Sequence, residues 1–184
     1  LGEMPFYEVE LAPFTYGGDG TTGARIREAQ HKAVELIPGS GIASINDLAY
    51  PYEYDEIHPR RKKEVGERLS YLALNRTYGM DYLPCEGPRF KSYEVRGGEI
   101  EVAFYNGESG FSPWHDIVGF EIAGEDKVFH PAEIRRGTQL NTVIVKSDKV
   151  PAPVAVRYCF RDFQVGNFTG RRCLPVIPFR TDNW

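Results

Sequence analysis

The chain has 184 residues, of which 41% are hydrophobic and 26% charged, a composition typical of one globular domain or two small ones rather than of a disordered chain. Its net charge of −4 and its pI of 5.6 argue against a nucleic-acid partner, because such partners select proteins with a basic face. No apolar run reaches the ~18 residues that a membrane-spanning helix needs.

The first predicted elements are a strand and a helix. Residues Met4 to Leu11 are rich in aromatic and β-branched side chains and predict a strand that ends before Pro13. A Gly/Thr loop follows, in which Thr21 or Thr22 is placed to cap the next helix. That helix is predicted over residues 24–37, whose apolar side chains recur on one face.

A second strand and a second helix come next. Residues 42–48 predict the strand, and the tyrosine-rich loop 49–58 follows it. Pro59 suits the first turn of a helix, because its missing N–H would be unpaired there in any case. The run from Arg60 to Tyr78 is amphipathic, and Gly79 is suited to end it.

Strand, helix, strand, helix is the rhythm of an α/β fold with a parallel sheet. Two parallel strands and two helices bury too little surface to be stable alone. We therefore expect further strands from residues before Leu1 or from a partner chain. Leu1 is not an initiator Met and stands close to a predicted strand, so we expect a processed or truncated product.

The pattern changes between Pro84 and Pro88, and short β-type runs separated by glycine-containing turns follow. We predict one domain over residues 1–84 and an antiparallel, β-sandwich-like domain over residues 85–184. The predicted strands of this second domain are Arg89 to Val95, Glu99 to Tyr105, Ile117 to Ile122, Thr142 to Lys146 and Pro153 to Phe160.

Cys85, Cys159 and Cys173 are the three cysteines of the chain. They show no CxxC spacing, and no histidine stands in metal-ligand register with them, so no zinc site and no cofactor is predicted. A disulfide between Cys159 and Cys173 and a set of three buried thiols both agree with the sequence.

The clearest candidate for chemistry is the segment Asp55-Glu56-Ile57-His58-Pro59. It follows a predicted buried strand, and ligands of open α/β sheets bind beyond the carboxyl ends of the strands. An ordinary imidazole, with a pKa of ~6.5, takes a hydroxyl proton close to neutral pH. A carboxylate on its other nitrogen fixes the tautomer. His58 is therefore the candidate general base, and Asp55, three residues earlier, is the candidate orienting acid.

Simpler interpretations stand beside these roles. His58 could merely cap the helix that Pro59 opens, and Asp55 could be a loop carboxylate that the helix dipole favours. His31, among charged neighbours in the first helix, is predicted to be a solvated surface residue. No serine lies in a Gly-x-Ser-x-Gly elbow, so no nucleophile for the base is recognisable in the chain.

Four segments, in chain order, resemble the sialate O-acetylesterase family of SGNH-type serine esterases. The segment Asp55 to Tyr78 resembles the last conserved block of that family, and Pro5 to Gln30 looks like its strand and following helix. Residues 119–126 and the closing stretch 154–182 are similar to further blocks.

The resemblance implies the C-terminal part of an SGNH hydrolase domain, with a flavodoxin-like parallel sheet, followed by a β-sandwich-like domain. It implies a periplasmic or secreted Ser–His hydrolase that removes acetyl groups from sugars, sialic acid being the named substrate. His58 matches the catalytic base of the family, and Asp55 matches the Asp-x-x-His spacing. Many sialate esterases instead carry the acidic or amide residue at the position of Glu56.

The family's Gly-Gln-Ser nucleophile block has no counterpart here. The resemblance therefore implies that the serine lies in a missing N-terminal part or in a second chain, and that this chain alone is inactive.

A different hypothesis is a non-catalytic glycan-binding or structural β-sandwich fragment. Four aromatic residues of the second predicted domain could either face sugar rings or form its core: Tyr105, Phe111, Trp114 and Phe120.

Overall fold

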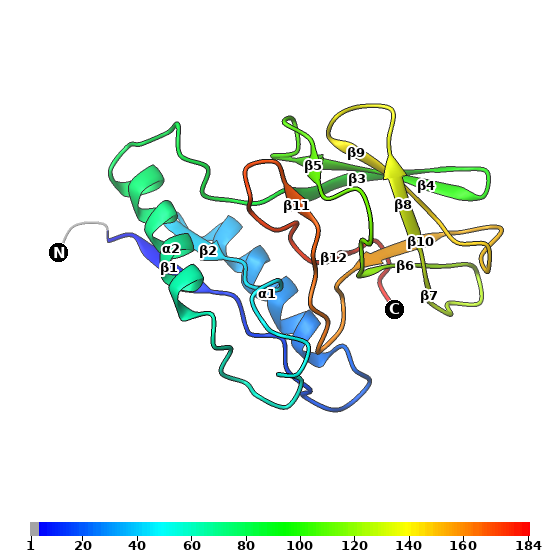
Figure 1. Cartoon of the computed structure of the whole chain (residues 1–184), viewed down its shortest axis with the longest axis horizontal. Coiled ribbons are helices and arrows are strands. Elements are labelled where there is room, and N and C mark those ends of the chain that lie inside the picture. The colour runs from blue at the N-terminus through cyan, green and yellow to red at the C-terminus, as the bar shows by residue number, and fades with distance from the viewer. Residues whose placement is uncertain (1–3) are drawn as a thin grey trace. The chain divides into compact units, whose positions relative to one another are not determined.

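The computed structural model describes residues 4–184, and Leu1, which we expected close to a strand, lies outside them. The chain forms two compact units. The first runs to Glu86 and also includes Arg161–Val165, and the second comprises Gly87–Phe160 and Gly166–Trp184. Figure 1 shows both α-helices in the N-terminal, blue-to-green part of the chain and a set of strands in the rest.

The first unit is built on a pair of parallel strands, β1 (Phe6–Val9) and β2 (Ser40–Ala43). Helix α1 (Thr22–Leu36) connects them, and helix α2 (Lys62–Leu72) continues into a π-helix (Ala73–Thr77). Both α-helices pack against β2, and all four residues of this strand are buried. The apolar face predicted for α2 is buried, with Leu72 at 0% exposure. The apolar face predicted for α1 is wrong, because Ile26 and Ile37 are 46% and 49% exposed and the helix buries Gly23, Ala24 and Arg27 instead.

The predicted flavodoxin-like parallel sheet is wrong. Among the described residues, parallel pairing is confined to β1 and β2, and the other strand pairs are antiparallel. The family resemblance implied this larger sheet, whereas the local pattern indicated only two parallel strands, which are the two that pair in the described chain. In addition, β2 ends at Ala43 rather than at Leu48, since the residues that follow form a turn in which Ile45 and Leu48 are buried in a small apolar cluster.

Helix α1 is fixed at its start by a distant residue. Thr21, the N-cap residue, makes no side-chain cap bond, and its hydroxyl donates to Asp19 at 2.7 Å instead. The carboxylate of Asp162 accepts the backbone N–H of Gly23 at 2.6 Å. A carboxylate is favoured there because the first N–H groups of a helix have no intrahelical partner. This bond ties the segment Arg161–Val165 to the first unit, which nothing in the local sequence had indicated.

The second unit contains two four-stranded antiparallel sheets. The first sheet has the order β3 (Arg89–Arg96), β4 (Glu99–Tyr105), β9 (Thr142–Lys146) and β8 (Glu133–Arg136). A tight turn at Gly97, which has a φ of 61°, joins β3 to β4 as a hairpin.

The second sheet has the order β12 (Phe179–Arg180), β10 (Ala155–Tyr158), β6 (Phe120–Ala123) and β7 (His130–Pro131). Residues 120–123 and 155–158 are all buried, which agrees with the central place of these two strands. The pairing is in register from Ala155 opposite Ala123 to Tyr158 opposite Phe120.

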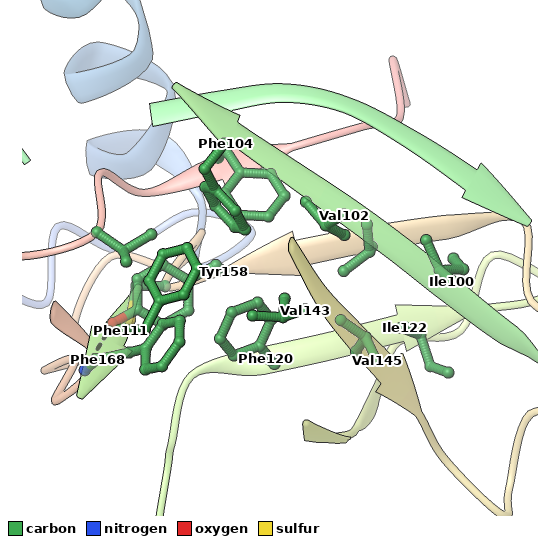
Figure 2. Close-up of a cluster of buried hydrophobic side chains, with 14 of the residues drawn as sticks. Ile100, Val102, Phe104, Phe111, Phe120, Ile122, Val143, Val145, Tyr158 and Phe168 are labelled. Carbon is green, nitrogen blue, oxygen red and sulfur yellow. Dashed lines mark hydrogen bonds between the residues drawn. The ribbon is translucent and has the colours of Figure 1, made fainter. Parts of the chain in front are cut away.

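One apolar core lies between these two sheets, and Figure 2 shows side chains of β4 and β9 directed toward those of β6. A short antiparallel pair, β5 (Phe111–Ser112) and β11 (Thr169–Gly170), adds Phe111 to it. Inward residues alternate along β4, as the two-residue period of a strand requires. Members that are fully buried include Ile100, Val102, Phe104, Ile122, Val143, Val145 and Val156.

Candidate active site

Asp55 and His58 lie in the loop that joins β2 to α2, and both side chains are exposed. The backbone N–H of His58 donates to Oε1 of Glu56 at 3.1 Å. Within residues 4–184, neither the Asp55 carboxylate nor the His58 imidazole forms a hydrogen bond or an ion pair. The fold thus brings the two predicted residues into one loop with accessible side chains, and the bond between them stays a prediction.

Glu53 braces this loop from beneath. Its side chain is 1% exposed, and its two carboxylate oxygens accept the backbone N–H groups of Tyr50 (2.8 Å) and Arg60 (3.2 Å). The Arg60 Nε lies 3.7 Å from the same carboxylate. The buried Glu53 side chain therefore joins the two ends of the segment that carries His58.

The start of the loop is clamped to α2. Arg68 forms a bidentate pair with Asp47, with both N–O distances at 2.6 Å, and donates to the carbonyl of Ser44 at 2.7 Å. The planar guanidinium matches a carboxylate in two parallel bonds, which gives geometric specificity as well as attraction. The loop therefore leaves β2 in a direction that α2 determines.

Exposed tyrosines precede His58 in the same loop. Tyr50 and Tyr52 stack with ring centroids 5.3 Å apart and planes within 5° of parallel. The Arg60 guanidinium lies 5.7 Å from the centroid of Tyr52. Tyr52 and Tyr54 are 60% and 56% exposed, so the loop that carries His58 also exposes aromatic rings with polar tips.

A buried polar cluster lies beyond the carboxyl ends of β1 and β2. Glu10 is fully buried, and one of its oxygens accepts bonds from the Ser44 hydroxyl and from the Ile45 N–H (2.8 Å). Its other oxygen is 3.8 Å from Nε of Arg27 and 3.8 Å from Nε2 of His31. Burial by itself would raise the pKa of Glu10, but the neighbouring His31, Arg27 and Ser44 hold that pKa below its ordinary value.

The prediction that His31 is a solvated surface residue is wrong, because its side chain is only 13% exposed and faces Glu10. Charged neighbours in sequence suggested solvent, but the helix turns this residue toward the end of β1. Glu10, Arg27 and Glu53 were also missed, since a lone charged residue carries no local signal that it will be buried.

The serines of the first unit are not presented as nucleophiles among the described residues. The Ser44 hydroxyl donates to the Glu10 carboxylate rather than to an imidazole. Ser40 and Ser70 donate to backbone carbonyls. A hydroxyl becomes a nucleophile when a base accepts its proton and the oxygen faces a substrate, and these three oxygens are engaged in structural bonds.

All three cysteines are thiols, with Cys159 buried and Cys173 exposed. Burial, together with the charge of Glu86, raises the pKa of the Cys85 thiol, so this group stays protonated and weakly nucleophilic. No cluster of three or more His, Cys, Asp or Glu side chains that could hold a metal ion is present within the described part of the chain. Within that part, no helix combines the length and the apolar character needed to cross a bilayer.

The aromatic residues of the alternative hypothesis divide into two groups. Phe111 and Phe120 are 1% and 2% exposed and belong to the core of the second unit. Tyr105 is exposed, with the Arg89 guanidinium 5.1 Å from its ring centroid. Trp114 is half-buried and packs edge-on against Phe111. Only the last two rings are therefore accessible to a ligand.

The chain is similar to a novel carbohydrate acetylesterase from Xanthomonas citri, whose crystal structure matches it with a TM-score of 0.86 and 41% sequence identity. The match covers 98% of this chain and 41% of that protein, so this chain spans less than half the length of the protein it resembles. No protein-family profile matches the chain, and no curated protein matches it by sequence. The Xanthomonas protein is a carbohydrate acetylesterase, which supports this class of enzyme without supporting sialic acid in particular.

Proposed function

We propose that this chain is part of a carbohydrate acetylesterase, which hydrolyses acetyl esters on sugars. The observation that carries the proposal is the similarity to the Xanthomonas citri carbohydrate acetylesterase, at 41% identity over 98% of the chain. The accessible imidazole of His58, on a loop that Glu53 braces, supports it from the chemistry of the site. A glycan substrate would place the protein in the periplasm or outside the cell.

In the proposed reaction, a serine hydroxyl supplied from outside these residues attacks the acetyl carbonyl. His58 takes the serine proton and returns it to the sugar oxygen as the C–O bond to the sugar breaks, which leaves an acetyl-serine. His58 then takes a proton from water, the resulting hydroxide attacks the acetyl group, and acetate leaves as the serine recovers its proton. The imidazole ends each cycle neutral, so no further reactant is needed.

The carboxylate that orients His58 is Asp55 as first choice and Glu56 as second. Asp55 is free of other bonds among the described residues and can turn toward the ring, whereas Glu56 already accepts the His58 backbone N–H. O-acetylated sialic acid is one substrate that fits this proposal, because the segment Asp55 to Tyr78 resembles the sialate O-acetylesterases.

The test measures acetate release from acetylated sugars by the natural polypeptide that contains this chain. We expect His58→Ala to lower kcat by at least ~10²-fold, the lower range for a general base. His115→Ala, which removes an exposed imidazole in the second unit, should leave kcat unchanged. Asp55→Asn and Glu56→Gln, compared at several pH values, identify the orienting acid as the one whose loss lowers kcat.

A second arm measures the 184-residue chain by itself. We expect no turnover, because the serines of its first unit are engaged in structural bonds. Acetate release by this chain, abolished by His58→Ala, would overturn the proposal of an external serine. An unchanged kcat for His58→Ala in the natural polypeptide would overturn the role of His58.

A further inference from the structure

A cavity of about 460 Å³ opens in the second unit. Its lining residues lie between positions 109 and 171, far along the sequence from His58. It lies at the start of β5, along the loop between β8 and β9, and at Arg171. All of its lining residues belong to the second unit, and its volume is within the range of small-molecule sites. The proposed esterase chemistry makes no use of it.

The lining is positively charged without compensation. Arg136 and Arg171 both line the cavity, and no Asp or Glu does. Neither guanidinium forms an ion pair with a residue between positions 4 and 184. Arg135, the neighbour of Arg136 on β8, is by contrast paired with Glu99 at 2.6 Å. Because guanidinium groups stay protonated, the cavity presents two fixed positive charges to whatever enters.

One wall of the cavity is held rigid by Glu101, a residue of β4 that is 7% exposed. Its Oε1 accepts bonds from the backbone N–H and the hydroxyl of Thr138, both at 2.7 Å, and from the hydroxyl of Thr142 at 2.9 Å. Its other oxygen is 2.5 Å from Arg96, which also pairs with Glu94 at 2.8 Å. The β8–β9 loop is thus fixed before a ligand binds, and Glu101 itself does not line the cavity.

The rest of the lining combines two aromatic residues, Phe111 and Trp114, with neutral polar groups. The Arg136 guanidinium lies 5.2 Å from the centroid of Trp114, and stacking of this kind orients its donor face. Leu140 is 73% exposed and adds a further apolar surface. The Gln139 carboxamide also lines the cavity and makes no side-chain hydrogen bond within the described chain.

From these groups we infer that the cavity is a binding site for an acidic sugar, a pyranose unit that carries a carboxylate. The guanidinium forks of Arg136 and Arg171 match the carboxylate, the amide of Gln139 matches ring hydroxyls, and the apolar C–H face of a sugar ring suits Trp114 and Leu140. The site does not depend on the esterase proposal, since it needs no reaction.

The test titrates the 184-residue chain with tri-galacturonate and with the same trisaccharide after its carboxylates are reduced to hydroxymethyl groups. Isothermal calorimetry gives the affinity, and the indole ¹H–¹⁵N signal of Trp114, assigned with Trp184→Phe, reports the location. We expect saturable binding of tri-galacturonate and binding of the reduced sugar that is weaker by about tenfold or more, the loss of one charged hydrogen-bonded contact.

Arg136→Gln and Arg171→Gln should each weaken tri-galacturonate binding by about tenfold, because each removes one charge-assisted contact. Arg135→Gln is the matched control, since it removes one positive charge from the same strand outside the cavity lining, and it should change affinity little. Circular dichroism of each variant verifies the fold.

Equal binding of the reduced trisaccharide, equal weakening by Arg135→Gln, or the absence of a saturable Trp114 shift would each overturn the inference. Sodium acetate that displaces tri-galacturonate at equal carboxylate concentration would overturn its sugar part and leave only an anion site.

Discussion

Replacing Glu10 by Gln tests whether the buried cluster stabilises the first unit by its charge. The carbonyl oxygen of Gln can take the place of the one Glu10 oxygen that accepts from both Ser44 and Ile45, so these two bonds are kept. Its amide group then replaces the oxygen that faces Arg27 and His31. Arg27, whose side chain is 2% exposed, loses the carboxylate 3.8 Å from its Nε. Removing one partner of a buried ion pair costs about 3–5 kcal/mol.

The lower end of that range applies here. Arg27 also donates to the backbone carbonyls of Arg161 and Asp162, and the Asp162 side chain is itself buried nearby. If Glu10→Gln lowers the free energy of opening of the β1–β2 region by about 3 kcal/mol, the open state becomes about 100-fold more populated than in the native chain.

Hydrogen exchange of the backbone amides of residues 40–46 measures this opening directly, with the amides of β9 in the second unit as an internal reference. Glu67→Gln is the matched control, because Glu67 pairs with Lys63 at 3.7 Å on an exposed helix face, a contact worth about 0.3–0.5 kcal/mol. If hydrogen exchange of the 40–46 amides is less than about tenfold faster in Glu10→Gln than in the native chain, the charge of Glu10 does not stabilise this region as argued.

The same cluster predicts a pH dependence. The pKa of Glu10 is lower in the folded chain than in the unfolded one, so its stabilising contribution is present above the unfolded value of ~4.3. That contribution is lost as the pH falls through the folded pKa. Opening free energies of the 40–46 amides, corrected for intrinsic exchange, should therefore decrease in acid for the native chain more steeply than for Glu10→Gln.

Two further predictions concern the loop and helix α2. Glu53→Gln should lower the free energy of local opening of residues 50–60 by about 1–3 kcal/mol, because an amide cannot accept both N–H groups that the carboxylate accepts. The control is Glu56→Gln, at an exposed position of the same loop. Equal hydrogen exchange in the two variants would contradict the bracing role. Gly66→Ala should raise the free energy of unfolding by about 1 kcal/mol, since a Cβ at this position meets nothing within 4 Å in mid-helix, and an unchanged or lowered Tm in thermal unfolding would contradict that expectation.

Much of the secondary structure was predictable from local pattern. The predicted strands at Glu99 to Tyr105 and Thr142 to Lys146 coincide with β4 and β9. The helix predicted after Pro59 is found as α2 and its π-helical extension, from Lys62 to Thr77. These elements follow from side-chain periodicity, which depends only on neighbours along the chain.

The candidate base was also recognisable from sequence, because a short acid–histidine loop between a strand and a helix is a local feature. The residue that supports this loop was not recognisable from the sequence. Glu53 is one acidic residue among tyrosines in the sequence, and only the folded loop brings the N–H groups of Tyr50 and Arg60 to its two oxygens. Which acids become buried depends on contacts between the ends of segments, and periodicity does not report those contacts.

The sequence by itself indicated both helices and most of the longer strands, and it placed Asp55 and His58 in one loop between a strand and a helix. Only the tertiary structure decided the extent of the parallel sheet, the burial of Glu10 with Arg27, and the cavity that holds Arg136 and Arg171. The bond from Gly23 to Asp162 joins residues 139 positions apart. Contacts of that separation arise from the packing of whole elements, whereas local patterns extend over only a few turns or strand residues.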